Sequence, residues 1–126
     1  MNGNSFLLDT NVLLYLTGGA LDLAALPDGE FAISFVTELE VLSYPSITAT
    51  EEEKLKKLLS DIPILDIPQE IKDLAITLRK KHRLKLPDAI VAASAMHLGA
   101  TLLTNDKGFS SITGLKTLPA LLNKAQ

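Results

Sequence analysis

Short apolar segments alternate with helix-forming segments along this chain. Apolar runs of this length, bounded by turn or helix signals, are typical of buried strands; they cover residues 6–8, 31–36, 62–67, 101–104 and 115–118. The segments with helical character cover 12–16, 37–44, 68–82 and 87–98, another begins at Thr50, and a short helix is expected after 118. Strands that alternate with helices predict an α/β fold with three layers, α/β/α, around a central, mainly parallel sheet.

Local signals refine this prediction. Pro63 and Pro68 bracket one short strand and place it at an edge of the sheet, because proline cannot donate a ladder hydrogen bond. Thr50 and Glu53 have the spacing of a capping box. In the helix at 37–44, Leu39 and Leu42 are expected to mark the buried side, together with Val36 and Val41.

The composition limits the class of protein. A chain of 126 residues, 47% of them hydrophobic, fits a single domain spanning 1–126. It contains no cysteine, which excludes disulfides, thiolate zinc sites and a cysteine nucleophile. The polar start, and the interruption of the first apolar stretch by Asp9 and Asn11, are unlike a signal peptide or a membrane span, so we expect a cytoplasmic protein without membrane contact.

Four acidic residues stand next to apolar segments, where an isolated carboxylate is costly unless it is paired, capping or bound to a metal. They are Asp9, Glu40, Asp88 and Asp106. Asp9 and Asp106 directly follow strands, and the carboxyl ends of parallel strands meet at one edge of the sheet, where ligands bind. Several oxygen ligands at one edge suit Mg²⁺ or Mn²⁺ better than zinc.

Each of these acids also has a simpler explanation. Asp9 suits a helix cap, Asp88 suits the positive end of its helix, and Glu40 has capping-box spacing from Thr37. Asp106 suits a turn. Asp66 is a fifth acid in an apolar setting, and only its predicted edge position sets it aside.

The net charge does not decide the question. A formal charge of −3 argues mildly against nucleic-acid binding, but leaving out the four acids raises it by four units, to +1. The one dense basic cluster lies at Arg79, Lys80, Lys81, His82 and Arg83, with Lys85 beyond it. It fits either a solvated helix end or a track for RNA phosphates.

Four segments, taken in order, resemble the motifs of one family. They lie at 6–13, 33–40, 86–95 and 103–109, and each contains one of the four acids. With these motifs, nearly the whole chain resembles the PIN domain ribonucleases, and among them the VapC-type toxins of prokaryotic toxin–antitoxin pairs. The resemblance implies that one or two Mg²⁺ or Mn²⁺ ions activate water for in-line cleavage of RNA, which leaves a 5′-phosphate and a 3′-hydroxyl.

The same resemblance assigns roles to individual residues. It makes Asp9, Glu40, Asp88 and Asp106 catalytic, with the three aspartates on the metal. It places Asn11, Thr104 and Lys107 around them. The basic cluster, which lies close to Asp88 in the sequence, supplies the expected RNA contacts Arg79, Lys81 and Arg83. It also implies a small antitoxin protein as partner and a homodimer. Glu38 stands where the family usually has an apolar residue, so it is a second candidate for the glutamate role, although the spacing from Ser34 favours Glu40.

Three other functions fit parts of the sequence. His82 and His97 could act as the acid and base of a metal-independent ribonuclease. A PIN domain could serve only to bind a partner. The segment from Asp9 to Val12 resembles the nucleophile loop of haloacid-dehalogenase-like phosphatases, although Asn11 replaces their second aspartate and no later lysine motif fits.

Overall fold

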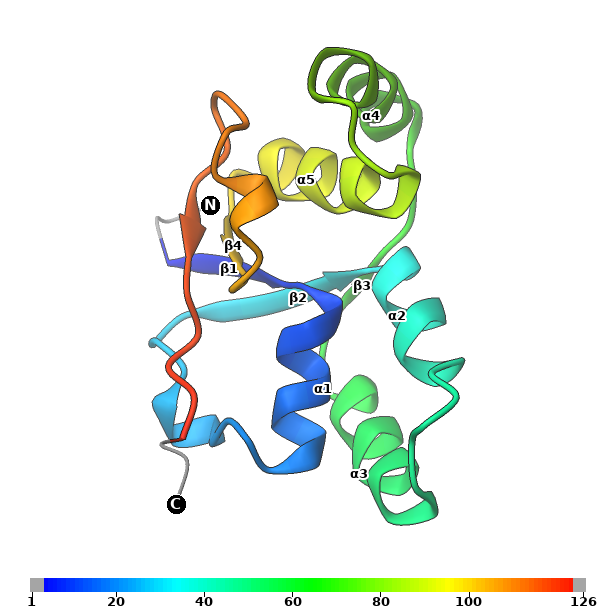
Figure 1. Ribbon diagram of the computed structural model, residues 1–126, viewed down its shortest axis with the longest axis vertical. Helices are drawn as coiled ribbons and strands as arrows, with labels where there is room; N and C mark the ends of the chain where they lie inside the picture. The colour runs from blue at the N-terminus through cyan, green and yellow to red at the C-terminus, as the bar shows by residue number, and fades with distance from the viewer. Residues whose placement is uncertain (1–3, 124–126) are drawn as a thin grey trace.

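A five-stranded sheet, in which every neighbouring pair of strands is parallel, forms the centre of the structure (Figure 1). The structure is a computed structural model that describes residues 4–123. The strand order is β3-β2-β1-β4-β5. The strands are β1 (Ser5–Leu8), β2 (Glu30–Ser34), β3 (Ile64–Leu65), β4 (Thr101–Leu103) and β5 (Thr117–Leu118). The helices are α1 (Thr10–Gly18), α2 (Phe35–Leu42), α3 (Ala49–Ser60), α4 (Gln69–His82) and α5 (Leu86–Leu98), and short 3₁₀ turns lie at Leu23–Ala25 and Lys107–Phe109.

Helices cover both faces of the sheet, as Figure 1 shows, which confirms the predicted three-layer fold. The alternation of side chains along β1 explains the two faces. Leu7 packs into the core shared with α4 and α5, whereas Phe6 and Leu8 pack into the core shared with α1 and α3. Because both faces are covered, β1 is buried along its whole length. No helix in the described part of the chain is long and apolar enough to cross a membrane.

Several predicted boundaries are confirmed. β3 lies at an edge of the sheet, between Pro63 and Pro68. The helix after Pro68 ends at His82, and α5 ends where Gly99 adopts the left-handed conformation with φ 70°.

The segment at 31–36 is only partly a strand. β2 ends at Ser34, whose hydroxyl accepts a hydrogen bond from the Val36 amide at 3.2 Å, so Phe35 already begins α2. The cap of α2 is therefore Ser34, and the proposed capping box between Thr37 and Glu40 is not formed. The helix expected after 118 is also wrong for residues 119–123, which are not helical.

The predicted buried side of α2 is only partly confirmed. Val41 is buried as expected and Val36 packs against the core, but the other buried residue is Thr37, four positions before Val41 on the same helical face. Leu39 is 59% exposed and Leu42 is also exposed. A residue two positions from Thr37 lies about 200° away around the helix, so Leu39 faces outward.

The capping box of α3 starts two residues earlier than predicted. The Thr48 hydroxyl accepts from the Glu51 amide at 3.1 Å, and the Glu51 carboxylate accepts from the Thr48 amide at 3.0 Å. These hydrogen bonds, backbone first and side chain second, lower the pKa of Glu51. Thr50 and Glu53 lie inside the helix, because the reciprocal pair at Thr48 already satisfies the free amides of the first turn.

This difference gives a direct test. Replacing Thr48 with Ala removes the cap and should lower the free energy of unfolding by about 0.5–2 kcal/mol. Thr50→Ala deletes the same hydroxyl two residues later and should have an effect below about 0.5 kcal/mol. Urea unfolding of both variants measures this, and an equal or larger loss in Thr50→Ala would contradict the assignment.

Candidate active site

Asp9 and Asp106 lie side by side because β1 and β4 are neighbours. Leu8 pairs with Leu103 in the parallel register, and the Asp9 amide donates to the Leu103 carbonyl at 3.2 Å. Each aspartate follows closely on its strand at the carboxyl edge of the sheet. The chain order also reverses here, since β2 and β3 lie on one side of β1 and β4 and β5 on the other. Such reversal points are where open α/β sheets bind ligands.

Thr104 connects the two aspartates. Its hydroxyl donates to Oδ2 of Asp9, and its oxygen accepts from the Asp106 amide at 3.0 Å. Asp9 also accepts from the Val12 amide at 2.8 Å, so it caps α1 as well. Asp106 likewise accepts from the Gly108 amide at 2.8 Å and shapes the following turn. Asp9 and Asp106 therefore keep their local roles, as a helix cap and a turn residue, and also belong to the candidate active site.

Two helices bring the other acids to the same edge. Asp88 lies half-buried in the first turn of α5, and Glu40 extends from α2. The Thr10 hydroxyl donates to Oε1 of Glu40 at 2.6 Å. All four acids border one small cavity of about 150 Å³. Its lining consists of Asp9, Thr10, Asn11, Glu40, Asp88, Val91, Asp106 and Phe109. Glu38 is not part of the lining, which favours Glu40 for the glutamate role.

The acids influence each other's ionisation. Burial raises the pKa of Asp88, and the negative charges of Asp106 and Glu40 raise it further, while Lys85 opposes them. Burial is also the main cause of the raised pKa of Asp9, against which the hydrogen bonds from Thr104 and Val12 act. The ionised cavity therefore holds carboxylates that repel one another.

The donors of this cavity fit a hard divalent cation. Carboxylates and the Asn11 side-chain amide offer oxygen ligands, which Mg²⁺ and Mn²⁺ prefer. Within residues 4–123, no three His, Asp or Glu side chains already stand in a metal-holding arrangement. Mutual repulsion keeps the carboxylates apart from one another, and a cation between them would offset this repulsion.

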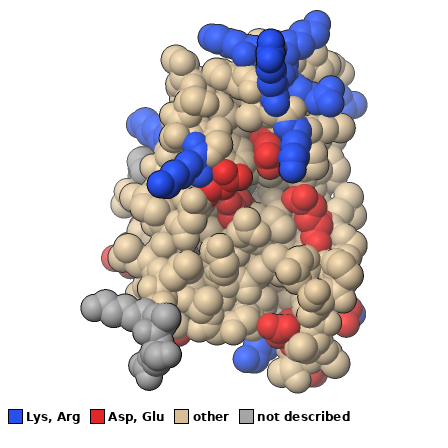
Figure 2. All heavy atoms as spheres, viewed as in Figure 1, with Lys and Arg blue, Asp and Glu red and all other residues tan. Residues whose placement is uncertain are grey.

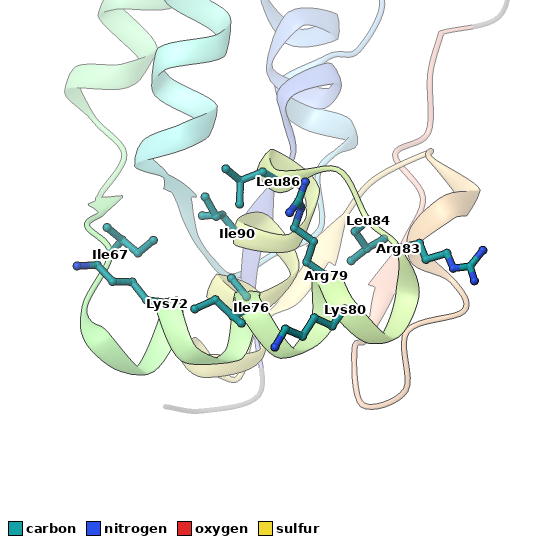
Figure 3. A pocket seen from close by; sticks show the side chains of 10 residues that line it. Ile67, Lys72, Ile76, Arg79, Lys80, Arg83, Leu84, Leu86 and Ile90 are labelled. Carbon is teal, nitrogen blue, oxygen red and sulfur yellow. The ribbon is translucent and has the colours of Figure 1, made fainter.

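On the face that Figure 2 displays, Lys and Arg side chains gather above the central acidic group. None of the predicted RNA contacts Arg79, Lys81 and Arg83 lines the cavity, however. Arg79 and Arg83 line a separate apolar groove of about 540 Å³ between α4 and α5 (Figure 3). Lys81 is exposed at the end of α4 and borders neither hollow, and Lys107 is exposed in the turn after Asp106.

The structure also bears on residues that the sequence left open or missed. Neither His82 nor His97 lines the acidic cavity, and Asp66 is exposed near the edge strand. Thr10, Val91 and Phe109 were not expected at the site. Thr10 lies next to Asp9 in the sequence, but its partner Glu40 is 30 residues away, and no local pattern indicates that contact.

Comparison with known proteins identifies the family. The PIN domain family model matches residues 6–115. The chain belongs to the PIN domain family. It is 30% identical over 116 residues to Ribonuclease VapC17 of Mycobacterium tuberculosis, which covers 86% of each chain.

Solved structures agree with this assignment. A toxin–antitoxin complex from Klebsiella pneumoniae contains a chain that is 34% identical, with a TM-score of 0.71, over 86% of this chain and 93% of that one. A chain of VapBC2 from Rickettsia felis, solved with a promoter DNA fragment, is 24% identical with a TM-score of 0.77, over 91% and 98%. The second similarity shows the fold alone. The family match disfavours the phosphatase alternative, and VapC-type PIN ribonucleases in general depend on divalent metal ions.

The repulsion within the cavity predicts an unusual stability effect. Asp88→Asn removes one carboxylate and should raise the melting temperature of the metal-free protein at pH 7. The pKa of Asp88 in the folded protein is raised above 3.8, its ordinary value. Below pH 3.8 the wild type therefore keeps its full stability relative to Asp88→Asn. As the pH rises through the folded-state pKa the wild type loses this stability, so the melting temperature of Asp88→Asn should exceed that of the wild type by a growing margin.

Calorimetry in EDTA across this pH range measures the difference. Asp66→Asn is the matched control, because it removes an exposed carboxylate outside the cavity. A metal-free Asp88→Asn protein that melts lower than the wild type at pH 7 would show that Asp88 has a stabilising partner instead of like-charged neighbours.

Proposed function

We propose that this chain is an endoribonuclease that depends on Mg²⁺ or Mn²⁺ and is the toxin of a toxin–antitoxin pair. The observation that carries the proposal is the meeting of four carboxylates from four segments around one cavity, at the edge where this fold binds ligands. Membership of the PIN family and the 30% identity to a named ribonuclease support the reaction class.

The aspartates have the metal-binding role in this proposal. Asp9, Asp88 and Asp106 hold the ion, and Thr104 fixes the orientation of Asp9 through the hydroxyl hydrogen bond. When bound there, such an ion would lower the pKa of a water molecule and offset the charge that develops on the phosphodiester. Glu40 accepts a hydrogen bond from the attacking water and so orients it, while Asn11, exposed beside the cavity, donates to the RNA backbone.

The basic side chains around the cavity bind the RNA backbone. Lys85 precedes Asp88 at the start of α5, and its positive charge opposes the rise in the pKa of Asp88. Lys107 follows Asp106 on the exposed side, and Lys81 and Arg83 extend the positive surface along the end of α4. Arg79 continues it toward the groove of Figure 3.

The protein partners follow from the same assignment. We propose that a small antitoxin inserts a segment into the acidic cavity and blocks it, in the cytoplasm. The similar chain from Klebsiella pneumoniae was solved in a toxin–antitoxin complex. We also propose a homodimer, because the mean hydropathy is +0.25 and large apolar side chains such as Leu39, Ile76 and Leu86 are more than half exposed.

The metal requirement is the first test of this function. Purified protein should cut a mixed RNA pool with Mg²⁺ or Mn²⁺ and lose the activity in EDTA, because the all-oxygen site needs a cation to activate water. The products should carry 5′-phosphates. Undiminished cutting in EDTA with cyclic phosphate ends would overturn the proposal in favour of the histidine pair, and absence of any cutting with both metals would favour a binding module.

Charge reversal tests the RNA path. Lys81→Glu and Arg83→Glu should weaken RNA binding and reduce the salt dependence of the binding constant, by about 0.7–0.9 in slope for each lost phosphate contact. Mn²⁺ binding should be kept. Lys56→Glu makes the same charge change on α3, where Lys56 pairs with Glu52 at 3.6 Å, and should leave the slope unchanged. An unchanged slope in the α4 variants would show a solvated helix end.

Light scattering tests self-association. The purified chain should have the mass of a dimer at micromolar concentrations, because pairing removes exposed apolar surface from water. A monomer that persists at high micromolar concentration would contradict the homodimer.

A further inference from the structure

Glu40 differs from the aspartates of the cavity in how it is held. It is exposed at the end of a flexible side chain, whereas Asp9 is only 6% exposed and Asp88 is half-buried. Asp106 is also exposed, but its side chain is shorter and accepts a hydrogen bond from the Gly108 backbone amide at 2.8 Å. A glutamate has three side-chain torsions to fix, and an exposed one loses considerable conformational entropy when it is held in a single position. A carboxylate that takes part in chemistry must nevertheless keep its position closely.

One hydrogen bond supplies that constraint. The Thr10 hydroxyl donates to Oε1 of Glu40 at 2.6 Å, a short distance typical of a bond to an ionised acceptor. Among residues 4–123, no other hydrogen bond or ion pair engages the carboxylate of Glu40. Thr10 uses one oxygen of the carboxylate, which leaves Oε2 without a hydrogen bond in the described part of the chain.

The two helices that carry this contact pack against each other. Val12 and Leu13 of α1 and Val41 of α2 are fully buried in one core, so the two helices are packed together just below Thr10 and Glu40. Threonine is β-branched, and its hydroxyl has few accessible rotamers. The position of the hydroxyl is therefore set by the fold and not by the glutamate.

We propose that Thr10 is a positioning residue, whose hydroxyl holds Glu40 against the cavity in its working orientation. The contact repeats, for the glutamate, what Thr104 does for Asp9. This inference rests on the function proposed above. It adds a residue with no charge and no place among the ligands, whose only route to the chemistry is through Glu40.

The test compares two substitutions that separate the hydroxyl from the shape of the side chain. Thr10→Val keeps the branching and loses the donor, and Thr10→Ser keeps the donor. Loss of a partner that orients a site carboxylate typically costs about 10–100-fold in metal affinity or activity. We expect Thr10→Val to lose that much in kcat, with little change in KM or in Mn²⁺ affinity, because the three aspartates that hold the ion are untouched, and Thr10→Ser to retain most of the activity.

The readouts are Mn²⁺ binding by calorimetry without RNA, steady-state cleavage, and melting in EDTA. Thr77→Val is the matched control, since the Thr77 hydroxyl on α4 only donates to the Asp73 carbonyl at 3.2 Å. Glu40→Gln and Glu38→Gln give the reference effects of losing each glutamate. We expect Glu40→Gln to be impaired and Glu38→Gln to resemble the wild type.

The outcomes are distinguishable. If Glu40→Gln is impaired but Thr10→Val is not, the positioning role is wrong and the proposed function stands. If Glu40→Gln cuts and binds Mn²⁺ like the wild type, the assignment of Glu40 fails, and the role of Thr10 fails with it. If Thr10→Val melts much lower in EDTA and Thr10→Ser restores nothing, Thr10 is structural and the inference is overturned.

Discussion

Leu8 of β1 pairs with Leu103 of β4, and this parallel pairing determines where every later feature of the site can be. Parallel strands end at the same edge, so the residues that follow them, Asp9 and Asp106, become neighbours. Both leucines are almost fully buried in the same core, and a shift of one residue in the pairing would take them out of this packing. The apolar core thus positions the polar site.

The site built on this pairing gathers charges that oppose each other. Burial and like charge raise the pKa of Asp88, and burial raises that of Asp9. The fold supports this arrangement with hydrogen bonds from hydroxyls, Thr104 to Asp9 and Thr10 to Glu40. A cavity lined by negatively charged oxygen donors, whose orientation is held by these hydroxyls, suits a divalent cation.

The sequence predicted the features that depend on local pattern. The parallel sheet, the edge strand and the four acids follow from apolar runs, prolines and the residues at strand ends. The sequence-based predictions failed where the outcome depends on contacts between residues that are far apart in the chain. Leu39 was expected inside and is exposed, because the phase of α2 is set by the cap at Ser34 and by burial of Thr37 and Val41. The contact of Thr10 with Glu40 joins two helices and has no sequence signature.

The central claim is that the four carboxylates surround a place for a divalent cation. A crystal grown with Mn²⁺ and measured for anomalous scattering tests it most directly. The account predicts a Mn²⁺ peak inside the cavity, bound by carboxylate oxygens of Asp9, Asp88 and Asp106, with Glu40 facing it. At saturating Mn²⁺, an empty cavity, or a peak only at a site elsewhere such as a histidine, would contradict the account.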